Sequence, residues 1–208
     1  MANGNGNGNG AGRIGALAPK DLMSLEQYAR SRDEFRARVI EHKRPRTIGV
    51  GPHTTWCFED RLTVQYQIQE MLRAERIFEL RGIQDELDAY NPLIPDGTNL
   101  KATMQIEYED VEERRVALSR LVGIEDRTWV MAAGHAKVYA IADEDLPREN
   151  DVKTSAVHFL RFELAPDMIV ALKGGAALGV GIDHPNFTVE IAAVPPATRD
   201  ALVADLRG

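Results

Sequence analysis

The sequence is poor in cysteine, in long apolar runs and in basic charge, and each shortage excludes a class of protein. Its one cysteine, Cys57, leaves no internal disulfide framework and no cysteine-rich zinc or iron–sulfur site. No run approaches the roughly 20 apolar residues that span a bilayer. The net charge of −7 provides no basic surface for nucleic acid. Because the sequence also shows no targeting signal, we expect a cytoplasmic protein that binds neither nucleic acid nor membrane.

Recognisable catalytic motifs are missing as well. There is no Gly-x-Ser-x-Gly elbow of the kind that hydrolases use. The five histidines include no pair spaced three or four residues apart, as a helical metal motif requires. The glycine-rich segment 174–181 matches neither nucleotide-binding loop, and Lys173-Gly174-Gly175 instead predicts the turn of a β-hairpin. The sequence therefore indicates no particular reaction.

The chain does have an ordinary globular composition, with 44% hydrophobic and 27% charged residues. Residues 1–13 are the exception, because they consist largely of alternating asparagine and glycine. Such a segment has almost no side chain to bury and much backbone freedom, so it predicts a disordered tail. Residues 14–208 are then long enough for a single domain, which is what we expect.

Helical and strand-like patterns occupy different parts of that domain. Helices are expected at about 24–41, 61–90, 110–123 and 197–206. Strands are expected at 46–51, 101–108, 128–133, 135–142, 155–164, 168–173, 177–182 and 187–194. This segregation predicts an α+β fold, in which N-terminal helices pack on a mainly antiparallel C-terminal sheet.

The longest expected helix, about 61–90, carries a carboxylate within its apolar stripe. At 100° per residue, Val64 and Ile68 lie on one face, and Glu75 falls in the middle of it. Glu79 lies close to the edge of the same stripe. Burying an unpaired charge costs several kcal/mol. Glu75 is therefore expected to be paired, to bind a cation or to be protonated.

Three interpretations of this carboxylate remain open. An arginine partner such as Arg161 would make it an ion pair. Glu75 and Glu79, together with His158 or His184, would make a metal centre suited to iron, manganese or zinc. A position at the solvent boundary would make Glu75 an ordinary surface residue.

Residues of the predicted strands complete the set of candidates. Arg161 and Glu163 are neighbours on one strand face and are expected to pair with each other or to meet Glu75. His158 shares the opposite face with apolar residues, which is typical of a hydrogen-bonded core histidine. His184 follows a predicted strand, so we expect it at a loop, where binding residues often lie.

Several short motifs follow one another along the chain. They are His42-Lys43-Arg44-Pro45-Arg46, Phe58-Glu59-Asp60-Arg61, Ala89-Tyr90-Asn91-Pro92, Leu100-Lys101-Ala102-Thr103 and Asp183-His184-Pro185. Together they resemble the bacterial family catalogued as domain of unknown function 3501, over about residues 17–194. One departure is Phe187, where the resemblance leads us to expect a tyrosine.

The resemblance implies a context rather than a reaction, because the family has no established activity. Its genes often lie beside rubrerythrin and an iron–sulfur oxidoreductase subunit, which implies a role in peroxide defence or redox metabolism. Our first hypothesis is a non-catalytic accessory protein that contacts rubrerythrin or the iron–sulfur subunit through its long helix or sheet face. The alternatives are a metal-dependent enzyme with a Glu/His site and a small-anion binder that uses Arg73, Arg76 or Arg161.

Overall fold

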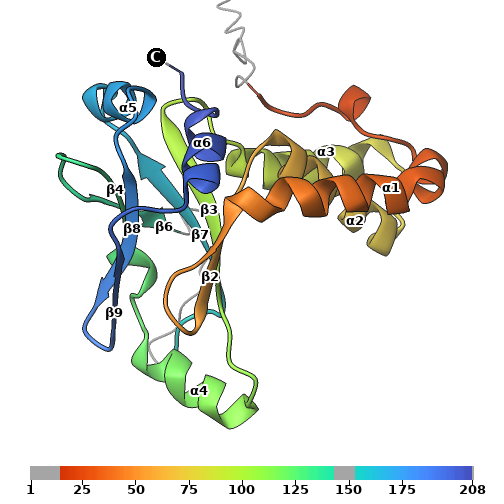
Figure 1. The fold of residues 1–208 in the computed structure, drawn as a ribbon. Helices are drawn as coiled ribbons and strands as arrows, with labels where there is room; N and C mark the ends of the chain where they lie inside the picture. Colours follow the sequence, from red (N-terminus) through yellow and green to blue (C-terminus); the bar gives the residue numbers. More distant parts are fainter. Residues whose placement is uncertain (1–14, 143–152, 208) are drawn as a thin grey trace, which may run out of the picture.

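The computed structural model describes residues 15–142 and 153–207. It confirms the expected α+β class, with helices concentrated in the N-terminal part and antiparallel sheets in the C-terminal part (Figure 1). The predicted tail, residues 1–13, lies outside the described residues. None of the helices in the described ranges is both long and apolar enough to cross a bilayer.

Two antiparallel sheets share one hydrophobic core. Sheet A has the strand order β1-β2-β3-β7-β6, and sheet B has the order β5-β4-β8-β9. Sheet A consists of β1 Thr47–Gly49, β2 Thr54–Phe58, β3 Asn99–Ile106, β7 Val157–Glu163 and β6 Ile141–Ala142. Sheet B consists of β5 Val138–Tyr139, β4 Thr128–Ala132, β8 Leu178–His184 and β9 Phe187–Ile191. Alternate residues of each strand, among them Trp56, Phe162 and Val180, point into this core.

Three helices form an arm that projects from the sheets (Figure 1). They are α1 Leu25–Lys43, α2 Arg61–Glu75 and α3 Leu80–Tyr90. A capping box starts α1, where a helix is expected, because the Ser24 side chain accepts a hydrogen bond from the Gln27 N–H. The arm has a separate core, made of Leu17, Val64, Ile68, Leu72, Leu87 and Ile94.

The prediction of one continuous helix over 61–90 is wrong. Arg76 adopts a left-handed conformation with φ 56°, and it ends α2. The Ile77 N–H donates to the Leu72 carbonyl at 2.9 Å, as in a Schellman-type helix end. Ile77 thereby folds back onto the arm core, and burial of its side chain favours the break.

Three further helices cover the sheets or their ends: α4 Val111–Arg120, α5 Pro166–Lys173 and α6 Pro196–Val203. The strand predicted at 168–173 is wrong, because this segment forms most of α5. Pro166 occupies the first helical turn, and the apolar residues Met168, Ile169 and Leu172 share the buried face. Gly174 and Gly175 consequently follow a helix end and not a hairpin strand.

A buried ion-pair network fixes the arm to the sheets. Arg46, which is 4% exposed, forms a bidentate pair with Asp205 at 2.7 and 3.0 Å. Its Nη2 also lies 3.2 Å from Asp60 Oδ2, and His42 Nε2 lies 2.5 Å from the same oxygen. Asp60 caps the N-terminus of α2. The base of the arm is therefore held by charges from α1, α2 and the segment after α6.

Candidate functional site

The structure does not place the predicted carboxylates in the interior. Glu75 is exposed in the last turn of α2, and Glu79 is exposed just before α3. Glu75 shares a helix face with the buried Leu72, but the arm core ends near Leu72, one turn earlier. The prediction that Glu75 faces the interior is therefore wrong. Its charge is still felt locally, since burial and then the Glu75 charge raise the pKa of Glu86.

The other candidates lie on the sheets. Arg161 and Glu163 form the expected ion pair, and Asn99 Nδ2 also donates to Glu163 at 3.1 Å. His158 is fully buried, with its Nε2 2.9 Å from Thr154 Oγ1 and 3.7 Å from Glu125 Oε2. This contact set matches the expectation of a hydrogen-bonded core histidine.

The candidates do not come together as a metal centre. No group of three His, Cys, Asp or Glu side chains that could hold a metal ion is found within residues 15–142 and 153–207. Glu75, Glu79, His158 and His184 are therefore not assembled into the expected site. The predicted anion clamp is also weakened, because Arg73 contacts Glu70 and Arg161 contacts Glu163.

His184 does reach a candidate site, as a residue that fixes a loop. Its Nδ1 accepts a hydrogen bond from the Asn186 N–H at 3.2 Å, so its Nε2 is assigned as the donor to the Val122 carbonyl at 3.2 Å. Asn186 Nδ2 donates to the Arg120 carbonyl at 2.7 Å. These bonds tie the β8–β9 turn to the end of α4.

An open cleft of about 620 Å³ lies beside this tie; we call it the α4 cleft. Its apolar lining consists of Tyr108, Val116, Ala117, Leu121 and Phe187. Its polar lining consists of Asp110, Glu112, Glu113, Arg120 and Asn186. The ionisable groups of the lining are three carboxylates, one guanidinium and the Tyr108 hydroxyl. Phe187, where we expected a tyrosine, makes that wall apolar.

The charges around the α4 cleft differ in how they are used. Asp110 caps α4 by accepting bonds from the Glu112 and Glu113 N–H groups at 2.9 and 2.8 Å. Glu112 pairs with Arg115. Glu113 forms no ion pair among the described residues. The pKa of Tyr108 is raised first by burial of its hydroxyl and then by the negative charge of Glu113. The Glu113 carboxylate is therefore available to pair with a cation near the Tyr108 ring.

The end of the arm is the second surface of interest; we call residues 76–81 the α2–α3 corner. Phe78 and Leu80 are 71% and 74% exposed there, while Ile77 packs on the arm core. Arg76 and Arg81 flank them, both exposed and without an ion pair among the described residues. Since α2 leaves the sheets and α3 returns to them, the corner lies at the outer end of the arm (Figure 1).

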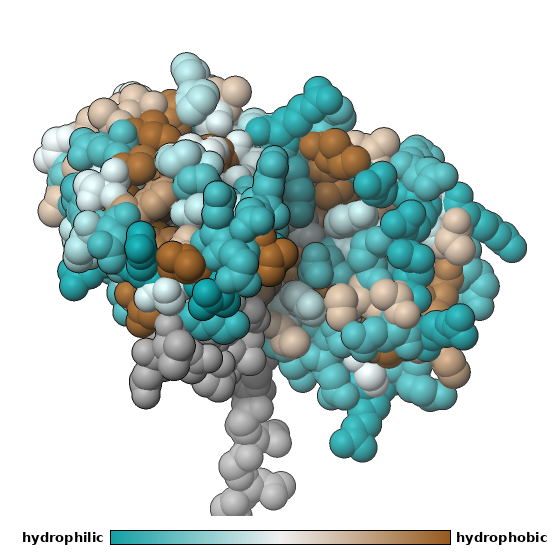
Figure 2. Space-filling model, turned by 90° about the horizontal axis from the view of Figure 1, so that it is seen from below, coloured by the Kyte–Doolittle hydropathy of each residue, from teal (hydrophilic) through white to brown (hydrophobic). Residues whose placement is uncertain are grey.

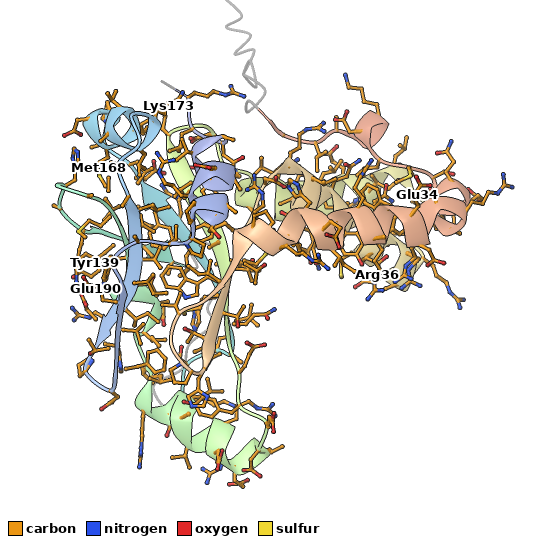
Figure 3. All side chains as sticks on the ribbon, in the orientation of Figure 1. Glu34, Arg36, Tyr139, Met168, Lys173 and Glu190 are labelled. Atoms are coloured by element: carbon orange, nitrogen blue, oxygen red, sulfur yellow. The ribbon has the colours of Figure 1, made fainter. Side chains whose placement is uncertain are left out.

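A polar cluster on the outer face of sheet B serves a structural purpose. Lys137 Nζ lies 4.0 Å from the centre of the Trp129 ring and 2.9 Å from Asp183 Oδ2. The Tyr139 hydroxyl donates to the same carboxylate oxygen at 2.7 Å, and Figure 3 shows Tyr139 on the side of the sheets away from the arm. Burial acts to raise the pKa of Asp183, but these hydrogen bonds outweigh it and lower that pKa. The cluster therefore covers Trp129.

Comparison with known proteins places the chain in a family. A family model described as "Protein of unknown function (DUF3501)" matches residues 16–206, so the chain belongs to that family. A crystal structure of a novel protein of unknown function from Burkholderia pseudomallei K96243 is similar, with 53% sequence identity and a TM-score of 0.89. That match covers 92% of this chain and 100% of the other. No curated protein matches.

Sequence reasoning missed the α4 cleft and the α2–α3 corner. One wall of the cleft includes Asn186 and Phe187, which follow the candidate His184. The other wall comes from α4, more than 60 residues away in the chain. The corner contains no glycine or proline, the residues that usually indicate a turn. An arginine occupies the left-handed position instead, so the sequence did not predict a turn there.

Proposed function

We propose that the protein is a non-catalytic, cytoplasmic accessory component of a rubrerythrin or iron–sulfur redox system. It docks its partner through the α2–α3 corner. The observation that carries this proposal is the exposure of Phe78 and Leu80 at the outer end of the arm. Single exposed apolar residues are ordinary, but neighbouring large ones on a projecting element are typical of contact sites.

The backbone at the corner supports the same interpretation. Arg76 is the only non-glycine residue with positive φ among the described residues. Left-handed conformation is unfavourable for residues with a Cβ, and here it ends α2 and turns the chain just before Phe78. The network around Arg46 holds the base of the arm, so the corner is presented on a fixed support. The redox assignment rests on the gene association that the family implies.

The test is direct binding of the purified chain to purified rubrerythrin and to the iron–sulfur subunit encoded in the same genome. We expect micromolar affinity for one of them. We expect the double variant Phe78→Ser/Leu80→Ser to bind at least about tenfold more weakly, because exposed anchors of this kind carry roughly 1–3 kcal/mol each. Biolayer interferometry measures both.

Val170→Ser is the matched control, because Val170 is 65% exposed on α5 and far from the corner in the sequence. It should bind like the unaltered chain. Absence of binding to either partner at about 100 µM, well above the micromolar dissociation constant that we expect, would contradict the redox role. If the double variant binds as tightly as the unaltered chain, the α2–α3 corner is not the contact site.

A further inference from the structure

The chemistry of the α4 cleft defines what can occupy it. Its volume of about 620 Å³ lies within the roughly 300–1,000 Å³ of ligand pockets. Tyr108, Val116 and Phe187 offer an apolar and partly aromatic floor. Glu113, an exposed residue of the lining, has no ion-pair partner among the described residues, and Arg120 lies on the same helix. The matching occupant is an apolar side chain with a cation beside it and an anion within reach.

The chain itself carries such a group on its arm. The α2–α3 corner presents Phe78 and Leu80, with Arg76 and Arg81 on either side and Glu79 between them. An arginine can pair with a carboxylate and also stack on an aromatic ring. The corner therefore offers a cation to Glu113, an anion to Arg120 and two apolar anchors to the floor.

We propose that the α2–α3 corner of one copy docks in the α4 cleft of a second copy. A chain cannot make this contact with itself, because the Arg46 network fixes the arm in a direction away from α4 (Figure 1). Viewed from below, the arm and the sheets form separate lobes with a hollow between them (Figure 2). The two contact surfaces thus lie on different parts of the molecule.

This contact joins two different surfaces, so it is heterologous. Such contacts build rings or chains of copies and not a simple symmetric pair. A corner inserted into one cleft buries little surface, in the range below about 1,200 Å² that is typical of weak encounters. We therefore expect association that grows with concentration and that salt weakens, because part of it depends on exposed charges.

Sedimentation velocity on the full chain tests the proposal. The average mass of the unaltered chain should rise between about 10 µM and about 1 mM, the range of weak complexes. The corner variant Phe78→Ser/Leu80→Ser and the cleft variant Glu113→Arg/Val116→Asp should each remain monomeric. Val170→Ser should associate like the unaltered chain. A monomeric unaltered chain at every concentration, or association that survives either variant, would overturn the proposal.

Mixing the two variants gives the decisive measurement. The corner variant keeps an intact cleft, and the cleft variant keeps an intact corner, so one productive contact remains between them. The mixture should form a dimer of one chain of each kind and should not grow further. A mixture that stays monomeric would overturn the proposal. The milder Glu113→Gln, at an exposed position, should weaken association several-fold while leaving the fold intact.

The inference goes beyond the proposed function, and the same variants separate the two. The corner variant should lose both self-association and partner binding. The cleft variant should lose only self-association, and it should bind the redox partner at least as tightly because its corner is free. If the unaltered chain self-associates but does not bind the redox partner, the proposed function fails and the self-docking proposal stands.

Discussion

At the scale of single residues, Trp129 and Gly181 together shape the outer face of sheet B. They are paired across β4 and β8. Trp129 is 0% exposed although it points away from the shared core, because its ring lies over Gly181 and beneath the Lys137 ammonium. Gly181 is thus required for the close approach of a side chain and not for backbone freedom, since its φ is not in the left-handed region.

Replacement of Gly181 by alanine should therefore destabilise the protein. The added Cβ would collide with the Trp129 ring and would lie 2.5 Å from the Val189 carbonyl oxygen. We expect a loss of about 2–3 kcal/mol in the free energy of unfolding. Urea denaturation followed by circular dichroism measures it. Gly49→Ala is the control, because a Cβ there would meet nothing within 4 Å, and equal stability of the two variants would contradict the account.

At the scale of the element, Arg76 divides one expected helix into two. A residue with a Cβ in this conformation carries a cost of about 1–2 kcal/mol, which glycine avoids. The break persists because Ile77 packs on the arm core and the Leu72 carbonyl gains a partner. The strained Arg76 and the exposed Phe78 thus belong to the same turn.

Arg76→Gly should stabilise the arm. Relief of the strain should exceed the added freedom of glycine in the unfolded chain, for a net gain of about 0.5–1 kcal/mol. Arg76→Ala removes the same charge but keeps the Cβ, so it should gain nothing. Thermal unfolding of the three proteins is the measurement, and a glycine variant no more stable than the alanine variant would show that the turn is not strained.

At the scale of the whole molecule, the Arg46 network connects segments that are far apart in the chain. Arg46 and Asp205 are 159 residues apart, and Asp60 joins them to the start of α2. Burial acts to raise the pKa of Asp60, but the bonds at the helix terminus and the nearby Arg46 charge keep that pKa below its usual value. The orientation of the arm therefore depends on charges supplied from both ends of the fold.

Asp205→Asn should destabilise the protein by about 2–3 kcal/mol, because it leaves the buried Arg46 guanidinium short of a counter-charge. Hydrogen exchange should increase at the base of the arm before it increases in the sheets. Asp200→Asn is the matched control, since Asp200 is 70% exposed and its pair with Arg199 should contribute less than about 0.5 kcal/mol. The same loss in both variants would exclude a special role for the network.

The sequence was informative where local signals are strong. The helical patterns at 24–41 and 110–123 and the strand patterns at 101–108 and 177–182 predicted those elements and the α+β class. The sequence was misleading where two structures satisfy the same pattern. Apolar residues at 168–172 fit a strand, but Pro166 and tertiary packing favour a helix.

The candidate site was less predictable for a geometric reason. A helical wheel reports the direction of Glu75 but not whether another element covers that turn. Only the neighbours of α2 decide that the core stops near Leu72. Similarly, the walls of the α4 cleft come from α4 and from residues 186 and 187, and no local pattern predicts that these segments meet.

The long separation between Arg46 and Asp205 has a consequence for biosynthesis. The core of the arm is built from residues 17–94, so its helices can pack early during translation. The ion pair between Arg46 and Asp205 must wait until residue 205 has been made. A nascent chain would thus carry a packed helical unit that lacks this ion pair between the synthesis of residue 94 and that of residue 205.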